Sequence, residues 1–379
     1  NNAQRRRDLS YRFGPRIAFR QERRKLNLAL DYQPDFLVYR DLTGRNRLNH
    51  RLQFDIEFKF SPRLHFRVRD SLRYATDLFF QPRPSEDFVP ELDSSTTLND
   101  TVFVPLSRQF NNNLRVDAVY QKSRRASLTL FGGFAKRDFS REHTGRGSLG
   151  DTKGVKAGLQ YLYRLSRSST VGTVYLFQNL SFFRPESRMV VHSPFFTFSR
   201  QVSPSIKVDV FGGPEYTRLH DRISFDLPFL GGRLTITSRI FRTRWGWALG
   251  GNLTKRSAKT VFRMSAYRRT SDGGGLLGAV TNTFAGVSLR RRLGRHWDAT
   301  WRLNYAQSNA LGFGLSGRTV RSQSAGFGLE RNLTERLTAR LGYHFIRQRK
   351  SGFPLTADLD RNRVTFGLFY RVGKIALGR

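Results

Sequence analysis

The stretch that decides the fold is residues 334–347, which read TERLTARLGYHFIR. Large apolar residues take alternate positions in it, with Leu337, Leu341 and Tyr343 on one parity. Arg340 and His344 take the other parity. Successive side chains of a strand point to opposite faces, so this period of two predicts a β-strand with one apolar face.

The same unit of strand, short turn, strand and long link recurs along the whole chain, and no segment reads as a helix. A turn at 331–334 precedes the stretch and a longer polar run, 348–360, follows it. The alternation predicts strands near residues 9–20, 25–40, 47–60, 63–77, 112–121, 125–139, 152–165, 169–181, 188–201, 204–219, 241–254, 258–270, 280–292, 296–309, 319–332, 335–349 and 361–372.

The connections between these strands alternate in length. Short turns alternate with longer links, of which 78–111, 140–151 and 220–240 are the longest. Outer-membrane barrels have short periplasmic turns and longer extracellular loops. We therefore predict an all-β fold: a transmembrane antiparallel up-and-down β-barrel in the bacterial outer membrane. Residues 1–379 form one domain in this interpretation, with a long extracellular loop at about 78–111.

Seventeen predicted strands conflict with the even strand number of single-chain bacterial barrels. If the last strand ends in the periplasm, residues 9–20 run in the same direction as 361–372. A first strand upstream of Asn1 would give a barrel of about 18 strands, whereas leaving 9–20 outside the wall would give about 16. We favour the larger barrel.

The charge of the chain admits two interpretations. There are 66 Lys and Arg against 29 Asp and Glu, a formal charge of +37, and no Cys. Such a charge suits nucleic-acid binding. In nucleic-acid-binding sheets, however, aromatic and basic residues share one face. Here they are segregated to opposite faces, which favours a lipid-facing wall around a basic lumen and no nucleic-acid partner.

Arginine on the lipid face at the bilayer midplane costs about 2–4 kcal/mol, so the strand arginines are expected to face a water-filled interior. Barrels of about 16–18 strands are wide enough to hold that water. The predicted pore-lining residues take the parity opposite the large apolar residues: Arg67, Arg69, Arg115, Arg164, Arg242, Arg244, Arg263, Arg302, Arg340, Arg363 and Arg371.

A second set of cations gathers at the short turns and predicts a basic rim on the periplasmic side. The rim consists of Arg23, Arg24, Lys122, Arg124, Arg167, Lys255, Arg256, Arg291 and Arg295. Two roles stay open for it at this point: contact with lipid phosphates, and capture of an anionic solute at the pore entrance.

Catalytic and metal motifs are weak or missing from the sequence. Gly145–Gly150 matches G-x-G-x-x-G but opens no helix after a buried strand, so it lacks the context that binds phosphate. The seven His residues show no metal-ligand spacing. We expect no cofactor, no metal and no enzymatic activity. A surface hydrolase would need a Ser or Asp within reach of His220 or His192, and Asp272–Gly275 predicts a flexible loop tip.

The unit from Gly328 to Phe345, together with DRNRVTFGLFYRV at 360–372, resembles the β-barrel porin families associated with exopolysaccharide and exosortase gene clusters. The resemblance implies passage of an anionic polysaccharide across the outer membrane. One feature departs from the pattern. Such barrels commonly finish on a terminal aromatic, whereas residues 373–379 follow Tyr370 in this chain.

Two functions follow as expectations. The first is an anion-favouring channel for an anionic solute or glycan. The alternative is a structural or anchoring barrel, plugged by the N-terminus or by loop 78–111, that serves as a scaffold in an envelope assembly. The expected partners are outer-membrane lipid and lipopolysaccharide, the anionic solute and periplasmic envelope proteins.

Overall fold

The computed structural model describes residues 8–75, 101–103, 108–140, 149–183, 186–229, 232–312, 317–352 and 358–371, with the side chains of Arg45 and 223–237 excepted. The predicted loop 78–111 therefore lies mostly outside the described residues, as do Gly145–Arg146–Gly147–Ser148 and residues 373–379. Within the described ranges, no helix has the length and apolar character needed to cross a membrane.

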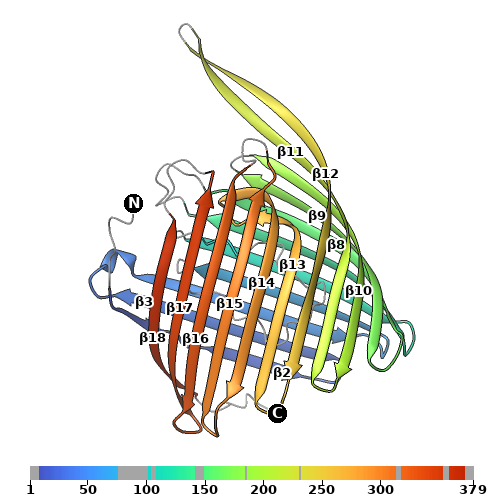
Figure 1. Cartoon of the computed structure of the whole chain (residues 1–379), viewed down its shortest axis with the longest axis vertical. Coiled ribbons are helices and arrows are strands. Elements are labelled where there is room, and N and C mark those ends of the chain that lie inside the picture. The colour runs from blue at the N-terminus through green and yellow to red at the C-terminus, as the bar shows by residue number, and fades with distance from the viewer. Residues whose placement is uncertain are drawn as a thin grey trace.

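Eighteen strands form a single sheet, which curls into a barrel with β13–β18 in front of β2–β7 (Figure 1). The one helix among the described residues is a 3-10 turn, Thr43–Arg45. The strands are β1 Ser10–Phe13, β2 Ile17–Glu22, β3 Leu26–Tyr39, β4 Arg47–Lys59, β5 Leu64–Ala75, β6 Gln109–Gln121, β7 Ala126–Phe139, β8 Asp151–Arg164, β9 Ser169–Phe183, β10 Ser187–Ser203, β11 Ile206–Phe229, β12 Gly232–Arg256, β13 Thr260–Gly273, β14 Leu277–Arg292, β15 Trp297–Ala310, β16 Thr319–Asn332, β17 Leu337–Ser351 and β18 Leu359–Tyr370.

From β3 to β18, each strand pairs antiparallel with the next one in the chain, which confirms the up-and-down topology. β1 and β2 both pair with β3 and are two halves of one strand, interrupted at residues 14–16. Residues 9–20 are thus in the wall, and the 16-stranded alternative is wrong. Within the described ranges no register joins β18 to β1 or β2, so the further strand at this seam stays a prediction.

One predicted link is wrong. The sequence predicts a long link over residues 220–240, but β11 and β12 stay paired from Ile206↔Lys255 to Phe229↔Gly232. The sequence contains the reason, since apolar Ile223, Phe225 and Leu227 alternate with polar residues. The two strands project well beyond their neighbours as a two-stranded ribbon (Figure 1).

The short turns at the opposite end are fixed by their own Ser and Thr residues. The hydroxyl of Ser61 accepts the backbone N–H of Leu64 at 3.0 Å, and that of Ser123 accepts the N–H of Ala126 at 3.1 Å. A hydroxyl that bonds its own backbone a few residues on stabilises a tight turn. This local chemistry makes the turn end of the barrel regular.

The two faces of the sheet differ in chemistry. One face presents large apolar side chains that no protein covers, including Trp245, Phe196 and Phe366, which are 71%, 73% and 73% exposed. The other face carries buried charged residues, among them Arg115, Asp117, Arg137 and Asp272. An exposed apolar band around a barrel is the surface that contacts lipid.

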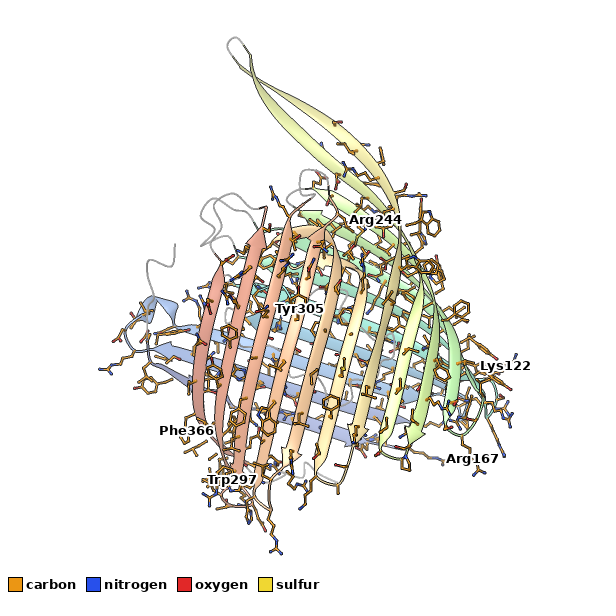
Figure 2. All side chains as sticks on the ribbon, viewed as in Figure 1. Lys122, Arg167, Arg244, Trp297, Tyr305 and Phe366 are labelled. Atoms are coloured by element: carbon orange, nitrogen blue, oxygen red, sulfur yellow. The ribbon has the colours of Figure 1, made fainter. Side chains whose placement is uncertain are left out.

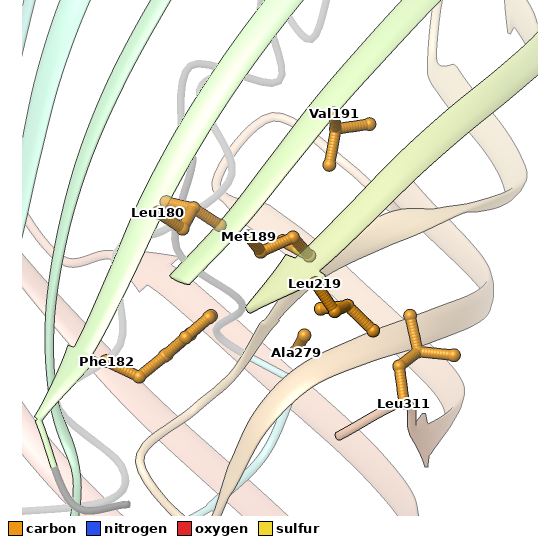
Figure 3. Close-up of a cluster of buried hydrophobic side chains, with 7 residues drawn as sticks. All are labelled: Leu180, Phe182, Met189, Val191, Leu219, Ala279 and Leu311. Atoms are coloured by element: carbon orange, nitrogen blue, oxygen red, sulfur yellow. The ribbon is translucent and has the colours of Figure 1, made fainter. Parts of the chain in front are cut away.

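Contacts between distant strands identify the second face as the interior. Leu180, Met189 and Leu219, on β9, β10 and β11, are at most 3% exposed. They belong to one buried cluster with Ala279 of β14 and Leu311, which follows β15 (Figure 3). Because β14 is not a neighbour of these strands in the sheet, the cluster spans the inside of the barrel.

Candidate channel lumen

The interior arginines of β5 and β6 are matched by acids. Arg67 forms an ion pair with Asp55, at 2.5 Å, and Arg69 pairs with Asp117 at 3.0 Å. Arg115 reaches the same Asp117 carboxylate at 2.6 Å and is 7% exposed. These three guanidinium groups are neutralised in part, because two carboxylates pair with them and Asp117 is shared.

The opposite sector, on β13–β18, is less balanced. Arg340 pairs with Glu330 at 2.5 Å, and an arginine on β14, Arg290, lies 3.8 Å from Asp298. The interior parity of this sector also holds Arg263, Arg302, Arg363 and Arg371. Cations therefore outnumber acids on this side of the lumen.

Glycines face several of these arginines across the strand pairs. Arg302 lies opposite Gly326, and Arg340 lies opposite Gly367. The glycines add no side chain of their own, but the Arg340 guanidinium lies 4.6 Å from the centroid of the Phe369 ring, and its Nε atom is buried. The interior parity of β15, β17 and β18 therefore carries one arginine each at Arg302, Arg340 and Arg363.

The remaining predicted pore residues lie at the two ends. Arg242 and Arg244 take the interior parity of β12, opposite Leu219 and Thr217, and Arg244 lies toward the end from which the ribbon projects (Figure 2). Arg164 is the last residue of β8, beside the short turns. The structure brings the predicted set onto one face but does not gather it into one ring.

The predicted basic rim lies at the short-turn end of the barrel. All nine residues are exposed, and Lys122 and Arg167 mark this end in Figure 2. The orientation of this end toward the periplasm follows from the layout of outer-membrane barrels. The two roles of the rim, lipid contact and solute capture, stay predictions.

At the other end of the lumen, the β13–β14 turn is tied to β7. The guanidinium of Arg137 donates to the carboxylate of Asp272 at 2.9 Å, and these side chains are 3% and 0% exposed. Asn111 accepts from Arg137 at 2.9 Å, and the backbone N–H of Gly150 donates to the carbonyl of Gly275 at 2.9 Å. The expectation of a flexible tip at Asp272–Gly275 is wrong, because a buried ion pair and backbone bonds fix it.

A short piece of the predicted long loop also lies inside the barrel. The backbone N–H of Phe103 donates to the side-chain oxygen of Gln348 at 2.7 Å, and the Gln348 amide donates back to the Phe103 carbonyl at 2.8 Å. Gln348 is fully buried, and Val102 packs with Leu277 and Val320. Residues 101–103 and the β13–β14 turn therefore narrow the lumen on the side away from the short turns.

Sequence reasoning offered loop 78–111 as a plug in the alternative function, but it missed the β13–β14 turn and the residues that anchor either segment. The anchoring residues are ordinary in sequence: Gln348 lies among polar neighbours, and Asp272 precedes a run of glycines. The single available signal was the acid at position 272, because an isolated acid beside glycines is well suited to bond backbone N–H groups. It does so here, accepting from Gly274 at 3.0 Å.

The hydrolase hypothesis finds no support in the geometry. Asp221 is 8% exposed and takes the interior parity. His220 takes the opposite parity, and the centroid of its ring lies 4.8 Å from that of Phe241. His192 is hydrogen-bonded to the hydroxyl of Tyr175 at 2.7 Å on the outer face. Within the described part of the chain, no group of three potential metal ligands lies together.

Comparison with known proteins gives structural matches alone. No protein-family model matches the chain, and no curated protein sequence does so. The copper transporter OprC matches with a TM-score of 0.51 and 9% identity, over 97% of this chain and 66% of that one. The ferric-catecholate import receptor Fiu from K12 E. coli matches with a TM-score of 0.47 and 8% identity, over 90% of this chain and 64% of that one.

The outer membrane protein opdK from Pseudomonas aeruginosa matches with a TM-score of 0.43 and 12% identity, over 96% of this chain and 93% of that one. The chain spans slightly less than two thirds of OprC and Fiu. At these identities the likeness to OprC establishes the fold. With the antiparallel wall and its apolar outer band, it defines the class as an outer-membrane β-barrel. The protein belongs in the outer membrane of Gram-negative bacteria.

Proposed function

We propose that this barrel is an outer-membrane transport channel whose lumen favours anions, and that its solute is an anionic polysaccharide. The observation that carries the proposal is the unequal distribution of interior charge. Interior arginines on β13–β18 outnumber the acids beside them, whereas Arg67, Arg69 and Arg115 on β5 and β6 each have Asp55 or Asp117 as an ion-pair partner. A lumen lined by one sign of charge raises the local concentration of the opposite ion.

The arginine chemistry supports the choice of a carboxylate- or phosphate-bearing solute. A guanidinium group stays charged at every physiological pH and binds such groups in a bidentate fork. Arg302, Arg340 and Arg363 lie on the interior parity of β15, β17 and β18, within one sector of the wall. A polymer with a negative charge on every few sugars could then move from one arginine to the next.

The inserted segments bear on how open the channel is. Residues 101–103 and the β13–β14 turn occupy the half of the lumen away from the short turns, held by Gln348 and by Arg137. This observation favours a second candidate, a plugged barrel that serves as a scaffold in an envelope assembly. The two candidates differ in one property, which is conduction of current.

Block of ionic current by a polymer tests the proposed solute. The full chain is reconstituted into planar bilayers, and polyuronate oligomers or neutral glucans of the same length are added from one side. The proposal expects concentration-dependent interruptions of current with the polyuronate and far fewer with the glucan. Equal block by the two polymers would remove the anionic-polysaccharide assignment. A silent bilayer containing folded barrel would favour the scaffold.

A further inference from the structure

Several strand arginines depart from the rule that places cations in the lumen, and three of them lie together on β16 and β17. Arg321 of β16 and Arg347 and Arg349 of β17 are exposed and take the outer parity. On the same strands, the interior parity holds Ser322 and Gln348, which are buried. These three residues, here called the outer arginine patch, therefore face away from the lumen at the end opposite the short turns.

The patch contains an electrostatic conflict. Arg321 and Arg349 lie directly opposite each other in the β16–β17 register. Like charges in this position destabilise a sheet, because the paired side chains are only about 5 Å apart at their Cβ atoms. An anion bound between the two guanidinium groups would turn this repulsion into attraction.

The nearby acids leave the conflict unresolved. Asp360 lies opposite Arg347 across the β17–β18 pair, and it is exposed. None of the three arginines forms an ion pair within 4.0 Å with any carboxylate of the described residues. The patch thus holds three cations against one neighbouring acid. Its charge matches a ligand with more than one negative group.

The position of the patch along the strands indicates the layer of the membrane in which its ligand lies. Arg349 is twelve positions above Leu337, the first residue of β17 (349 − 337), and a strand crosses the hydrocarbon in about 9–11 residues. Below the patch, Leu341 and Tyr343 are 44% and 40% exposed on the same outer parity. The patch therefore lies at the headgroup level, immediately above the apolar band.

Two tyrosines mark the same boundary. The hydroxyl of Tyr343 donates to the side-chain oxygen of Asn362 at 2.7 Å, and that of Tyr305 donates to Gln307 at 3.1 Å. Both rings belong to the exposed outer surface, and both hydroxyls reach a polar neighbour. Tyrosine at a membrane interface keeps its ring in the apolar layer and its hydroxyl in the polar one.

We infer that the outer arginine patch is a binding site for the phosphate groups of an outer-leaflet glycolipid, with the acyl chains lying on the apolar outer face of β15–β18. Arg321 and Arg349 share one phosphate, and Arg347 contributes a further guanidinium about 7 Å along β17. The site lies on the outer wall and is independent of whether the lumen conducts. It rests on the barrel orientation that places the short turns in the periplasm.

The test uses the full chain in detergent and two probes: bisphosphorylated lipid A, and the same lipid with its phosphates removed. Native mass spectrometry reports the fraction of protein that retains lipid during a titration. The wild-type protein is expected to bind the phosphorylated probe about tenfold or more tightly, since charge-assisted bonds to phosphate are among the strongest polar contacts. The triple substitution R321Q/R347Q/R349Q is expected to abolish this preference.

A matched control removes the same charge from the other end of the barrel. Arg63, Arg125 and Lys259 are exposed turn residues, and R63Q/R125Q/K259Q is expected to keep the preference for phosphorylated lipid. Asp360→Asn, which removes the acid beside Arg347, is expected to strengthen it. Equal retention of phosphorylated lipid by the wild type and the triple variant would overturn the assignment. So would displacement of the lipid by millimolar inorganic phosphate, which would indicate a site for a free anion.

Discussion

Arg137 of β7 and Asp272 of β13 form an ion pair across the barrel interior, with 2.9 Å between nitrogen and oxygen and almost no exposure of either side chain. The two residues are 135 positions apart in the chain and belong to strands that are not neighbours in the sheet. The pair therefore joins two sides of the wall. It fixes the β13–β14 turn inside the lumen.

The substitution Asp272→Asn should both destabilise the barrel and widen it. It leaves the Arg137 guanidinium buried without its counter-charge, and breaking a buried pair in this way costs about 3–5 kcal/mol. The unfolding free energy can be followed by tryptophan fluorescence in urea, and the channel by single-channel conductance. We expect a loss of stability and a larger conductance step.

The control for this substitution is Glu186→Gln. Glu186 pairs with Arg222 at 3.1 Å, but the two side chains are 65% and 50% exposed. An exposed pair contributes about 0–1 kcal/mol, so this variant should unfold like the wild type. An Asp272→Asn protein with wild-type stability and wild-type conductance would show that the ion pair does not hold the turn in place.

Gln348→Leu should release residues 101–103 from the inner wall. The substitution removes both hydrogen bonds to the Phe103 backbone, and each buried polar group left unpaired costs about 1–3 kcal/mol. The expected result is a conductance with added rapid fluctuations, measured in planar bilayers. Gln201→Leu, which loses a bond to the Ser203 carbonyl in a turn, should behave like the wild type. Identical current traces for all three proteins would contradict this role of Gln348.

Gly213→Ala should block folding, because there is no space for its methyl group. A Cβ at this position would lie 1.9 Å from the carbonyl oxygen of Pro194 on the neighbouring strand, and a backbone atom cannot rotate away. Overpacking in a tight site costs about 1–3 kcal/mol and more where backbone must move. Gly246→Ala is the matched control, since nothing lies within 4 Å of its Cβ. Folded yield, read as the heat-modifiable shift on a gel, should fall for the first variant and not for the second.

Substitution of Arg302, Arg340 and Arg363 by Gln should reduce the preference of the channel for anions. The change removes three cations from the β15–β18 sector and leaves the Glu330 carboxylate without its partner. The ratio of anion to cation permeability, obtained from reversal potentials, should fall several-fold, on the order expected for the loss of a focused charge. An unchanged ratio would mean that these residues do not govern permeation. The turn variant R63Q/R125Q/K259Q provides the comparison at equal charge.

Most of the wall could be predicted from the sequence, because its signal is local. Leu337, Leu341 and Tyr343 alternate with Arg340 and His344 over one strand, and the period of two needs no tertiary information. The interruption at residues 14–16 did not hide the first strand, because the residues on both sides keep their pairing with β3.

The features that the sequence did not reveal depend on long-range contacts. The bond between Phe103 and Gln348 joins residues 245 positions apart, and no local pattern distinguishes Gln348 from an exposed Gln. The β11–β12 ribbon was missed for a different reason. Between residues 220 and 240, the alternation of apolar and polar residues favours strands, whereas the long extracellular loops typical of outer-membrane barrels favour a loop.

The prediction that strand arginines face the lumen fails near the strand ends. It placed arginines in the lumen because the bilayer interior penalises them, but that penalty falls to about 0–1 kcal/mol near the interfaces. Arg321, Arg347 and Arg349 lie at that level and point outward without a conflict with the lipid core. The depth of an arginine in the bilayer decides whether it can face lipid. The alternation of apolar and polar residues does not report this depth.

The central claim, an anion-favouring lumen, is tested most directly by the reversal potential of the wild-type protein in a planar bilayer under a potassium chloride gradient. The account predicts current through the barrel and a reversal potential whose sign shows that chloride is more permeant than potassium. A reversal potential of the opposite sign, or the lack of any current from folded and inserted protein, would contradict it.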